Sequence, residues 1–269
     1  MNQPGNPGEV IRTVQNQLEC DLYLGGYWLP IGKLKPAVKM PVRPPAAPAG
    51  SPARAVSQER IMSDAEPRKE KQKRLDDLVR RMGSCCRCSL AQTRLHLVPG
   101  EGNPCARIVF VGEAPGASED EQGRPFVGRA GQLLTNIIEA MGLRRQEVYI
   151  CNILKCRPPE NRDPQANEIA ACIEYLYEQL RIIEPEMIVA LGAHAAKTLL
   201  NSTAAIGELR GRVHAYYPEP LSKPIKLVAT YHPAYLLRNY SPDNRRRVWH
   251  DMQMVLKELG LPVPKGKQE

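Results

Sequence analysis

Beyond Arg107, short apolar runs rich in β-branched residues alternate with longer stretches of helical periodicity. We interpret the apolar runs as buried strands, because each is short and apolar on both faces; they span 108–111, 148–151, 187–191 and 226–229. The stretches of helical periodicity predict helices over 130–141, 163–184, 193–200 and 243–259. Strands and helices in this order predict a mostly parallel sheet with helices on both faces.

The predicted helix over 163–184 carries end signals as well as an apolar face. Asp163 is a favourable cap for a helix N-terminus, and Pro164 suits the first turn. Six apolar residues repeat at helical spacing along one face, which we expect to pack against the sheet: Ile169, Cys172, Ile173, Leu176, Leu180 and Ile183.

The composition divides the chain into three parts. Residues 1–65 form an extension predicted to be poorly ordered, because its Pro- and Ala-rich stretch 35–52 has too few periodic apolar residues to pack and suits an extended linker. Residues 66–262 form the predicted folded domain, which begins with a helix over 66–82. Residues 263–269 form a C-terminal tail.

The charge balance narrows the class of partner only slightly. The chain has 37 Lys and Arg against 29 Asp and Glu, a net charge of +8. This excess favours a polyanionic partner but is also common on ordinary soluble proteins. No apolar run reaches the roughly 18 residues needed to span a bilayer, and the N-terminus lacks the layout of a secretory signal. We therefore expect a cytoplasmic protein without a membrane partner, in which short-spaced cysteines are metal ligands or buried thiols rather than disulfides.

Residues that are able to bind a ligand or take part in a reaction gather where the predicted strands end. Ligands bind at this edge in such folds. The first strand runs into a Gly-rich turn, Gly112 to Gly116, whose spacing differs from that of a dinucleotide-binding loop. Asn152 ends the second strand and can offer both a donor and an acceptor to a planar ligand, and His232 follows the fourth strand. Taken singly, Asn152 is also compatible with a turn, His232 with a structural histidine and Phe126 with the core.

Four cysteines have a spacing typical of a metal centre. Cys85-x-x-Cys88 is followed by Cys156 in a Pro-rich loop and by Cys172 on the predicted helix. Four thiolates suit either a tetrahedral zinc ion or a [4Fe-4S] cluster, and spacing alone does not choose between them. The alternative is that Cys172 is a core thiol and Cys156 a loop cysteine that binds nothing.

Three long motifs, in this order along the chain, resemble those of one family. GEAPGxxED with GRPFVGRAGQLL, VYICNILKCRPPENRDP followed by Cys172, and HPAYLLRN are similar to motifs of the family 4, iron-sulfur-type uracil-DNA glycosylases, over residues 85–259. The resemblance implies a three-layer α/β/α sandwich on a four-stranded, mainly parallel sheet. It also implies that Cys85, Cys88, Cys156 and Cys172 bind a structural [4Fe-4S] cluster.

The same resemblance implies a uracil pocket. Phe126 would stack on the flipped base, and Asn152 would pair with its N3-H and O4 edge and so reject cytosine. Ala114 and Gly116 belong to the matched turn around the base. Glu119 would lie near uracil C5 and help to exclude thymine.

Catalytic and DNA-binding roles follow from the resemblance in the same way. His232, with backbone N-H groups of the turn, would stabilise the departing uracil anion, and Glu113 would orient the attacking water or stabilise the sugar cation. Ala114 stands where another uracil glycosylase family has a water-activating Asp, so catalysis would depend more on the leaving group. Leu236, with Leu237 as its neighbour, would wedge into the vacated base stack, and Arg238 would hold a phosphate.

The implied function is that of a monofunctional uracil-DNA glycosylase in base excision repair, which leaves an abasic site. No Lys falls on a matched catalytic position, and residues 157–171 contain no His that would trap the base. The partner would be uracil-containing DNA, single- or double-stranded, bound by a monomer. Two alternatives stay open: a zinc-stabilised nucleic-acid-binding module without catalysis, and the same fold acting on hypoxanthine or xanthine.

Overall fold

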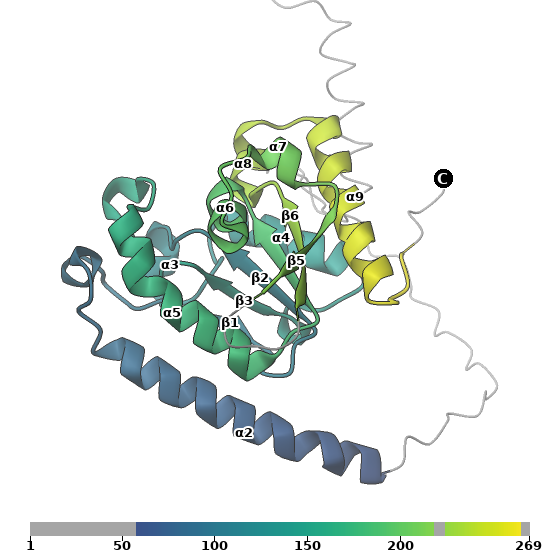
Figure 1. The fold of residues 1–269 in the computed structure, drawn as a ribbon, viewed down its shortest axis with the longest axis horizontal. Helices are drawn as coiled ribbons and strands as arrows, with labels where there is room; N and C mark the ends of the chain where they lie inside the picture. The colour runs from purple at the N-terminus through teal and green to yellow at the C-terminus, as the bar shows by residue number, and fades with distance from the viewer. Residues whose placement is uncertain (1–57, 218–223, 265–269) are drawn as a thin grey trace, which may run out of the picture.

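The computed structural model describes residues 58–217 and 224–264, with side chains from residue 67 onward. Residues 1–57 of the predicted extension and 265–269 of the predicted tail lie outside the described residues. Within the described ranges, helices surround a central sheet (Figure 1).

The sheet has six strands in the order β1-β3-β2-β4-β6-β5. Its four inner strands are parallel neighbours and match the predicted strands to within one residue at each end: β2 (Ile108–Gly112), β3 (Tyr149–Asn152), β4 (Met187–Leu191) and β6 (Ile225–Thr230). The α/β class is therefore confirmed, but the sheet has two antiparallel edge strands beyond the predicted four: β1 (Glu101–Gly102) and β5 (Val213–Tyr216). The sequence misses them because β1 has two residues and most of β5 is not buried, so neither forms an apolar run.

The inner strands end at a common edge of the sheet. Gly112 pairs with Asn152 across β2 and β3, and Leu191 pairs with Thr230 across β4 and β6. Residues that directly follow these strand ends are therefore brought together even though they are far apart in the sequence, as expected for parallel strands.

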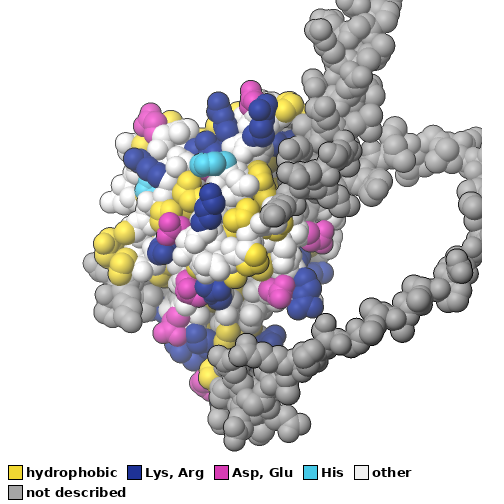
Figure 2. All heavy atoms as spheres, turned by 90° about the vertical axis from the view of Figure 1, so that its right-hand side faces the viewer, with side chains coloured by type: hydrophobic (Ala, Val, Ile, Leu, Met, Phe, Trp, Pro, Cys, Tyr) yellow, Lys and Arg dark blue, Asp and Glu magenta, His cyan; other side chains and the backbone are white. Residues whose placement is uncertain are grey.

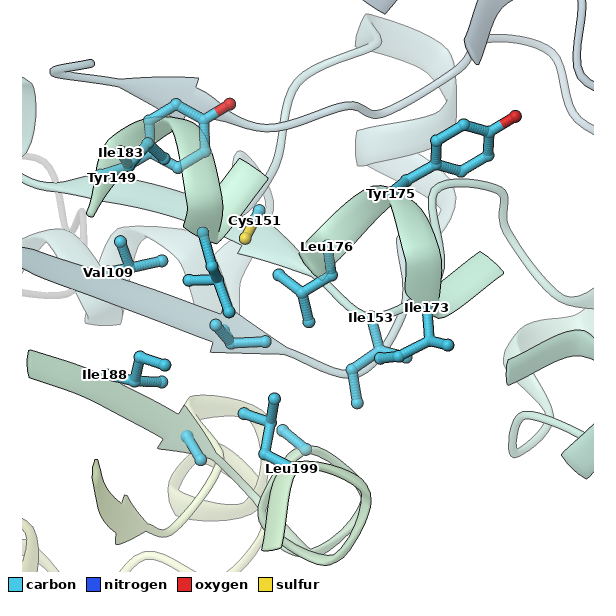
Figure 3. Packing of buried hydrophobic residues seen from close by; sticks show 14 of the residues in the cluster. Val109, Tyr149, Cys151, Ile153, Ile173, Tyr175, Leu176, Ile183, Ile188 and Leu199 are labelled. Atoms are coloured by element: carbon cyan, nitrogen blue, oxygen red, sulfur yellow. The ribbon is translucent and has the colours of Figure 1, made fainter. Parts of the chain in front are cut away.

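Helices cover the two faces of the sheet and enclose two apolar cores. In β2, Val109 and Val111 face the first core, whereas Ile108 and Phe110 face the second. Figure 3 shows the first core, where the side chain of Leu176 packs between the sheet and the helix that carries it. The first face is covered by α5 (Ala166–Ile183), α6 (Ala193–Leu200) and α7 (Ile206–Leu209), and the second by α4 (Arg129–Ala140), α8 (Pro233–Arg238) and α9 (Pro242–Glu258).

A long helix, α2 (Gln58–Gly83), lies along the outside of α5 (Figure 1). Leu75, Leu78 and Met82 are buried on its inner face, in agreement with their helical spacing. Cys85 follows directly after the end of α2, so this outer helix fixes where the first cysteines lie.

Shorter elements join these layers: η1 (Ser89–Gln92), α3 (Ala117–Gln122), η2 (Arg145–Glu147) and η3 (Pro159–Asn161). The two that bear on the site are α3, which follows the Gly-rich turn after β2, and η3, which lies in the loop before α5. Among the described residues, no helix is both long and apolar enough to cross a membrane.

The start of α5 differs from the prediction. The helix begins at Ala166 with Gln165 as its N-cap, so Asp163 is not the capping residue. Instead, the buried carboxylate of Glu168 accepts a hydrogen bond from the Gln165 backbone N-H at 2.9 Å and pairs with Arg162. Asp163 is thereby left free of the helix, and its carboxylate lies 3.6 Å from Nε2 of His194.

Candidate active site and cysteine site

A pocket of about 700 Å³ opens at the edge where the parallel strands end. It takes residues from the turns that follow β2, β3, β4 and β6, which bring together segments up to 125 positions apart, from Glu113 to Arg238. Eight of the residues predicted to act on substrate or DNA line it: Glu113, Ala114, Gly116, Glu119, Phe126, Asn152, His232 and Arg238.

Asn152 presents a free polar atom to this pocket. The residue is 2% exposed, and its Oδ1 has no hydrogen-bond partner. Gly112 leaves room for it, because a Cβ at Gly112 would lie 2.3 Å from Oδ1. A buried acceptor without a partner costs roughly 1–3 kcal/mol, so a ligand that supplies an N-H donor here is favoured.

Phe126 forms an apolar wall of the pocket. Its ring lies 5.7 Å from the His232 ring, centroid to centroid, and the side chain is 6% exposed. The backbone has φ +51°, a left-handed conformation that non-Gly residues adopt at a cost. Gly131 permits the close packing of this turn, since a Cβ there would collide with the Phe126 carbonyl.

Glu119 holds the loop that carries Phe126. One carboxylate oxygen accepts from the backbone N-H groups of Val127 and Gly128, at 2.9 and 3.0 Å, and the other accepts from Gly116 at 3.2 Å. The carboxylate is thus occupied by backbone donors. The Gly116 N-H is occupied too, because it donates to this carboxylate.

His232 is held in one orientation by its own loop. Nδ1 accepts a hydrogen bond from the Ala234 backbone N-H at 3.1 Å, so the neutral ring carries its proton on Nε2. Burial, followed by the nearby Arg238, lowers the pKa of His232 to about 4. Gly192 packs against the ring, because a Cβ there would lie 2.9 Å from the His232 Cβ. The site therefore holds a neutral imidazole with one N-H to donate.

A buried polar network anchors the strand that leads to His232. Thr230, at the end of β6, donates from Oγ1 to the Asp251 carboxylate at 2.7 Å. Asp251 is fully buried on α9 and pairs with Arg210 at 2.8 Å. This network joins α9 to the sheet directly beneath the His232 loop.

The low pKa of His232 makes the stability of the fold depend on pH. An unfolded imidazole has a pKa of about 6.5, so the unfolded chain takes up this proton before the folded chain does as the pH falls. The stability contributed by neutral His232 is complete above the unfolded pKa and is lost as the pH falls toward about 4. We expect the melting temperature of wild type to fall more steeply over this window than that of His232→Gln. Equal slopes in melting curves would contradict the assignment.

Glu113 lies in a cluster that the sequence does not predict. Oxygen and nitrogen atoms of Glu113, Asp163 and His194 lie within 4.8 Å of one another, and all three residues line the pocket. Burial, opposed by the nearby His194, raises the pKa of Glu113. His194 is missed because it enters from the start of α6; its place three residues after β4, another strand end, is the signal that points to it.

The predicted DNA-contacting leucine is corrected by the structure. Leu236 is 3% exposed and packs in the second core, whereas Leu237 is 39% exposed. A side chain in the core is unable to enter DNA without leaving the fold, and Leu237 is the exposed leucine of this pair. Arg238 is exposed and lines the pocket.

Basic residues on α9 do not form a surface of uniform positive charge. Arg246 pairs with Asp243, and Arg247 donates to the Tyr231 hydroxyl at 3.3 Å. Figure 2 shows the side of the molecule with α9, where Lys and Arg side chains are interspersed with acidic and apolar ones. The Arg run is therefore at least partly a solvated helix face.

The four predicted metal-ligating cysteines line one small cavity between the end of α2 and α5. Cys156 and Cys172 are buried, and burial raises the pKa of Cys172 to about 11. Two donors approach the sulfur atoms: Arg94 Nη1 lies 3.3 Å from Cys156 Sγ, and the Lys155 backbone N-H lies 3.4 Å from Cys172 Sγ. The remaining described cysteines, Cys86, Cys105 and Cys151, do not line this cavity.

Sulfur spacing bears on the choice of metal. Thiolates bound to one zinc ion at about 2.3 Å lie roughly 3.8 Å from one another in a tetrahedron. Among the described residues, no three of these sulfur atoms lie within 4.8 Å of one another. In the metal-free chain the four sulfur atoms are therefore not gathered at the spacing of a single tetrahedral ion.

The chain has relatives of known kind. Residues 99–253 match the family model described as the uracil DNA glycosylase superfamily. The type-4 uracil-DNA glycosylase of Archaeoglobus fulgidus is 46% identical over 194 residues, which are 71% of this chain and 96% of that protein. For the type-4 enzyme of Thermotoga maritima, identity is 48% over 64% of this chain and 88% of the relative. A type-5 uracil-DNA glycosylase of Pyrobaculum aerophilum is 34% identical over 55% of this chain and 83% of that protein.

Proposed function

The chain belongs to the uracil DNA glycosylase superfamily and, within it, to the type-4 uracil-DNA glycosylases, and from that premise we propose how its pocket works. The protein hydrolyses the N-glycosidic bond of uracil in DNA, as a repair enzyme. The observation that carries the proposal is the free, buried Oδ1 of Asn152 beside Phe126 and His232.

Base recognition rests on Asn152 and Phe126. The Oδ1 of Asn152 accepts the N3-H of uracil, and its amide NH₂ donates to O4. Cytosine is rejected because its N3 is an acceptor and its N4 a donor, so both pairs would fail. The Phe126 ring stacks on the base, and Glu119 fixes the loop that positions this ring rather than touching the base through a free oxygen.

Bond cleavage leaves positive charge on the sugar and negative charge on the departing base. The C1′-N1 electron pair goes to uracil, and the Nε2-H of His232 donates to O2, where the negative charge gathers. Glu113 faces the sugar side, where its carboxylate orients the water that attacks C1′ and takes its proton. Ala114 supplies no second carboxylate, and among the residues that the structure describes no Lys lines the pocket. In keeping with this, we propose that the enzyme is monofunctional and leaves an abasic site.

Cys85, Cys88, Cys156 and Cys172 hold a [4Fe-4S] cluster. Supporting this choice are the similarity to the type-4 enzymes and the two N-H donors directed at sulfur, which are typical surroundings of such clusters. When bound, the group supplies structural cross-linking, because base hydrolysis moves no electrons. A brown anaerobic preparation with broad visible absorption supports it; a colourless protein with stoichiometric zinc would refute it.

DNA binding involves the α8 loop. Leu237 fills the space left by the flipped base, and Arg238 contacts a phosphate. Uracil-containing DNA, single- or double-stranded, is the substrate; we further propose that the protein acts as a monomer in the cytoplasm. A zinc-stabilised binding module without catalysis would leave Asn152 and His232 without a role.

Leu237→Ala separates flipping from chemistry. We expect excision from duplex DNA to fall by about 10-fold, because the wedge offsets the cost of opening the stack, and excision from the same strand unpaired to change little. Leu95→Ala, which removes another exposed Leu, is the matched control. A loss of equal size on both substrates would show that Leu237 does not act in flipping.

The proposed reaction is tested by identifying the released base. Oligonucleotides that contain uracil, hypoxanthine, xanthine or only normal bases are incubated with the protein, and free bases are measured by mass spectrometry. We expect uracil to be released and cytosine and thymine to be retained. If uracil stayed in the DNA after incubation with cluster-loaded protein, the proposed reaction would be refuted. If only hypoxanthine or xanthine were released, the substrate would be that purine base and not uracil.

A further inference from the structure

Lys155 is a buried lysine at the junction of the two sites. It is 1% exposed, and its Nζ donates to the Asn152 carbonyl oxygen and to Gln179 Oε1, both at 2.6 Å. Gln179, 1% exposed on α5, is fixed in turn, since its Nε2 donates to the Pro99 carbonyl at 2.7 Å and to the Tyr149 hydroxyl at 3.2 Å. The ammonium is thus one member of a closed hydrogen-bond network.

The other end of this residue lies at the cysteine site. The backbone N-H of Lys155 points at Cys172 Sγ, and the next residue along the chain is Cys156. Among the described residues, no carboxylate pairs with Lys155, and its neighbouring titratable groups are the thiols of Cys151 and Cys172. A cluster bound by four thiolates carries net negative charge, which is the partner that a buried ammonium otherwise lacks.

We propose that Lys155 is a positioning residue that couples the cysteine site to base recognition by holding Asn152. The side chain of Asn152 has no hydrogen bond at Oδ1, so its direction depends on its backbone. That backbone lies at the last paired position of β3, where Lys155 Nζ holds the carbonyl oxygen. The inference rests on the proposed pocket, in which Asn152 reads uracil.

The coupling explains how a structural cluster serves a reaction that it does not enter. Displacement by about 1 Å of a side chain that positions the substrate costs on the order of 100-fold in rate. The path from Cys172 through Lys155 to Asn152 consists of a backbone N-H, one side chain and one carbonyl oxygen. Loss of the ammonium is therefore expected to reduce uracil excision even when the cluster remains bound.

Lys155→Met tests the proposal in a double-mutant cycle with Asn152→Ala. Each variant is assayed by single-turnover uracil release, and cluster content is followed by visible absorbance. We expect Lys155→Met to keep its cluster and lose about 100-fold in rate, and the double variant to be no slower than Asn152→Ala alone, because Lys155 acts through Asn152. Lys226→Met, which removes an exposed lysine, is the control and is expected to stay at wild-type rate.

Each outcome decides the matter. Losses that multiply in the double variant, or a Lys155→Met protein with unchanged rate, would overturn the proposal. If Lys155→Met does not fold, Gln179→Leu gives the same cycle, because it removes the second acceptor and loosens the ammonium. A wild-type rate for Asn152→Ala itself would refute the proposed pocket instead, so the two failures are distinguishable.

Discussion

Asn152→Ala is expected to slow uracil excision by about 100- to 1000-fold while leaving the fold intact. The substitution removes the buried acceptor and the amide donor that pair with the base, and the loss of one such preorganised group costs this much in comparable sites. Because Oδ1 has no partner in the folded protein, its removal breaks no internal hydrogen bond. Single-turnover release measures the rate, and melting curves measure the fold.

The control for Asn152→Ala lies in η3, in the loop between β3 and α5. Asn161→Ala changes the same residue type in η3, where the side chain lines the same pocket but its amide oxygen accepts from Arg157, and is expected to retain most of the activity. A similar loss in both variants would mean that the pocket is sensitive to any change at its lining, and the special role of Asn152 would fail.

Cys156→Ala is expected to abolish the visible absorbance and to lower the melting temperature by about 10 °C or more. The proposed cluster would tie the end of α2 to the loop after β3 and to α5, and the binding energy of a structural metal group is folding energy. Several kcal/mol lost from a domain of this size corresponds to a shift of this order. Arg94 would also lose the sulfur that it contacts.

Cys105→Ala is the matched control, because Cys105 is a half-buried free cysteine away from the cavity. It is expected to keep both the absorbance and the melting temperature. If Cys156→Ala also kept both, the cysteine site would bind nothing that the fold needs, and the cluster assignment would be wrong.

The parallel strands were predictable because they are buried on both faces. An apolar run such as 187–191 has no other stable place, and β4 agrees with it at both ends. The same reasoning predicted which residues line the pocket: Asn152 ends β3, His232 follows β6, and parallel strands end at one edge of the sheet. The motif resemblance then gave the pocket its chemistry.

Other features depend on tertiary contacts that the sequence does not display. Leu236 and Leu237 are the same residue type side by side, and only the packing of α8 decides which is buried. Asp163 looks like a helix cap, but Gln165 is the N-cap of α5, and its backbone N-H donates to Glu168, which pairs with Arg162. Lys155 reads as an ordinary loop lysine until the structure places its Nζ between Asn152 and Gln179.

The central claim is that this pocket hydrolyses the uracil N-glycosidic bond, and the most direct test is cleavage of an end-labelled oligonucleotide with a single uracil. The DNA is incubated with wild type, Asn152→Ala or His232→Ala and then treated with alkali, which breaks the strand at an abasic site. We predict a break at the uracil position that needs both alkali and the two intact side chains. No break with cluster-loaded wild type, or equal cleavage by all three proteins, would contradict the account.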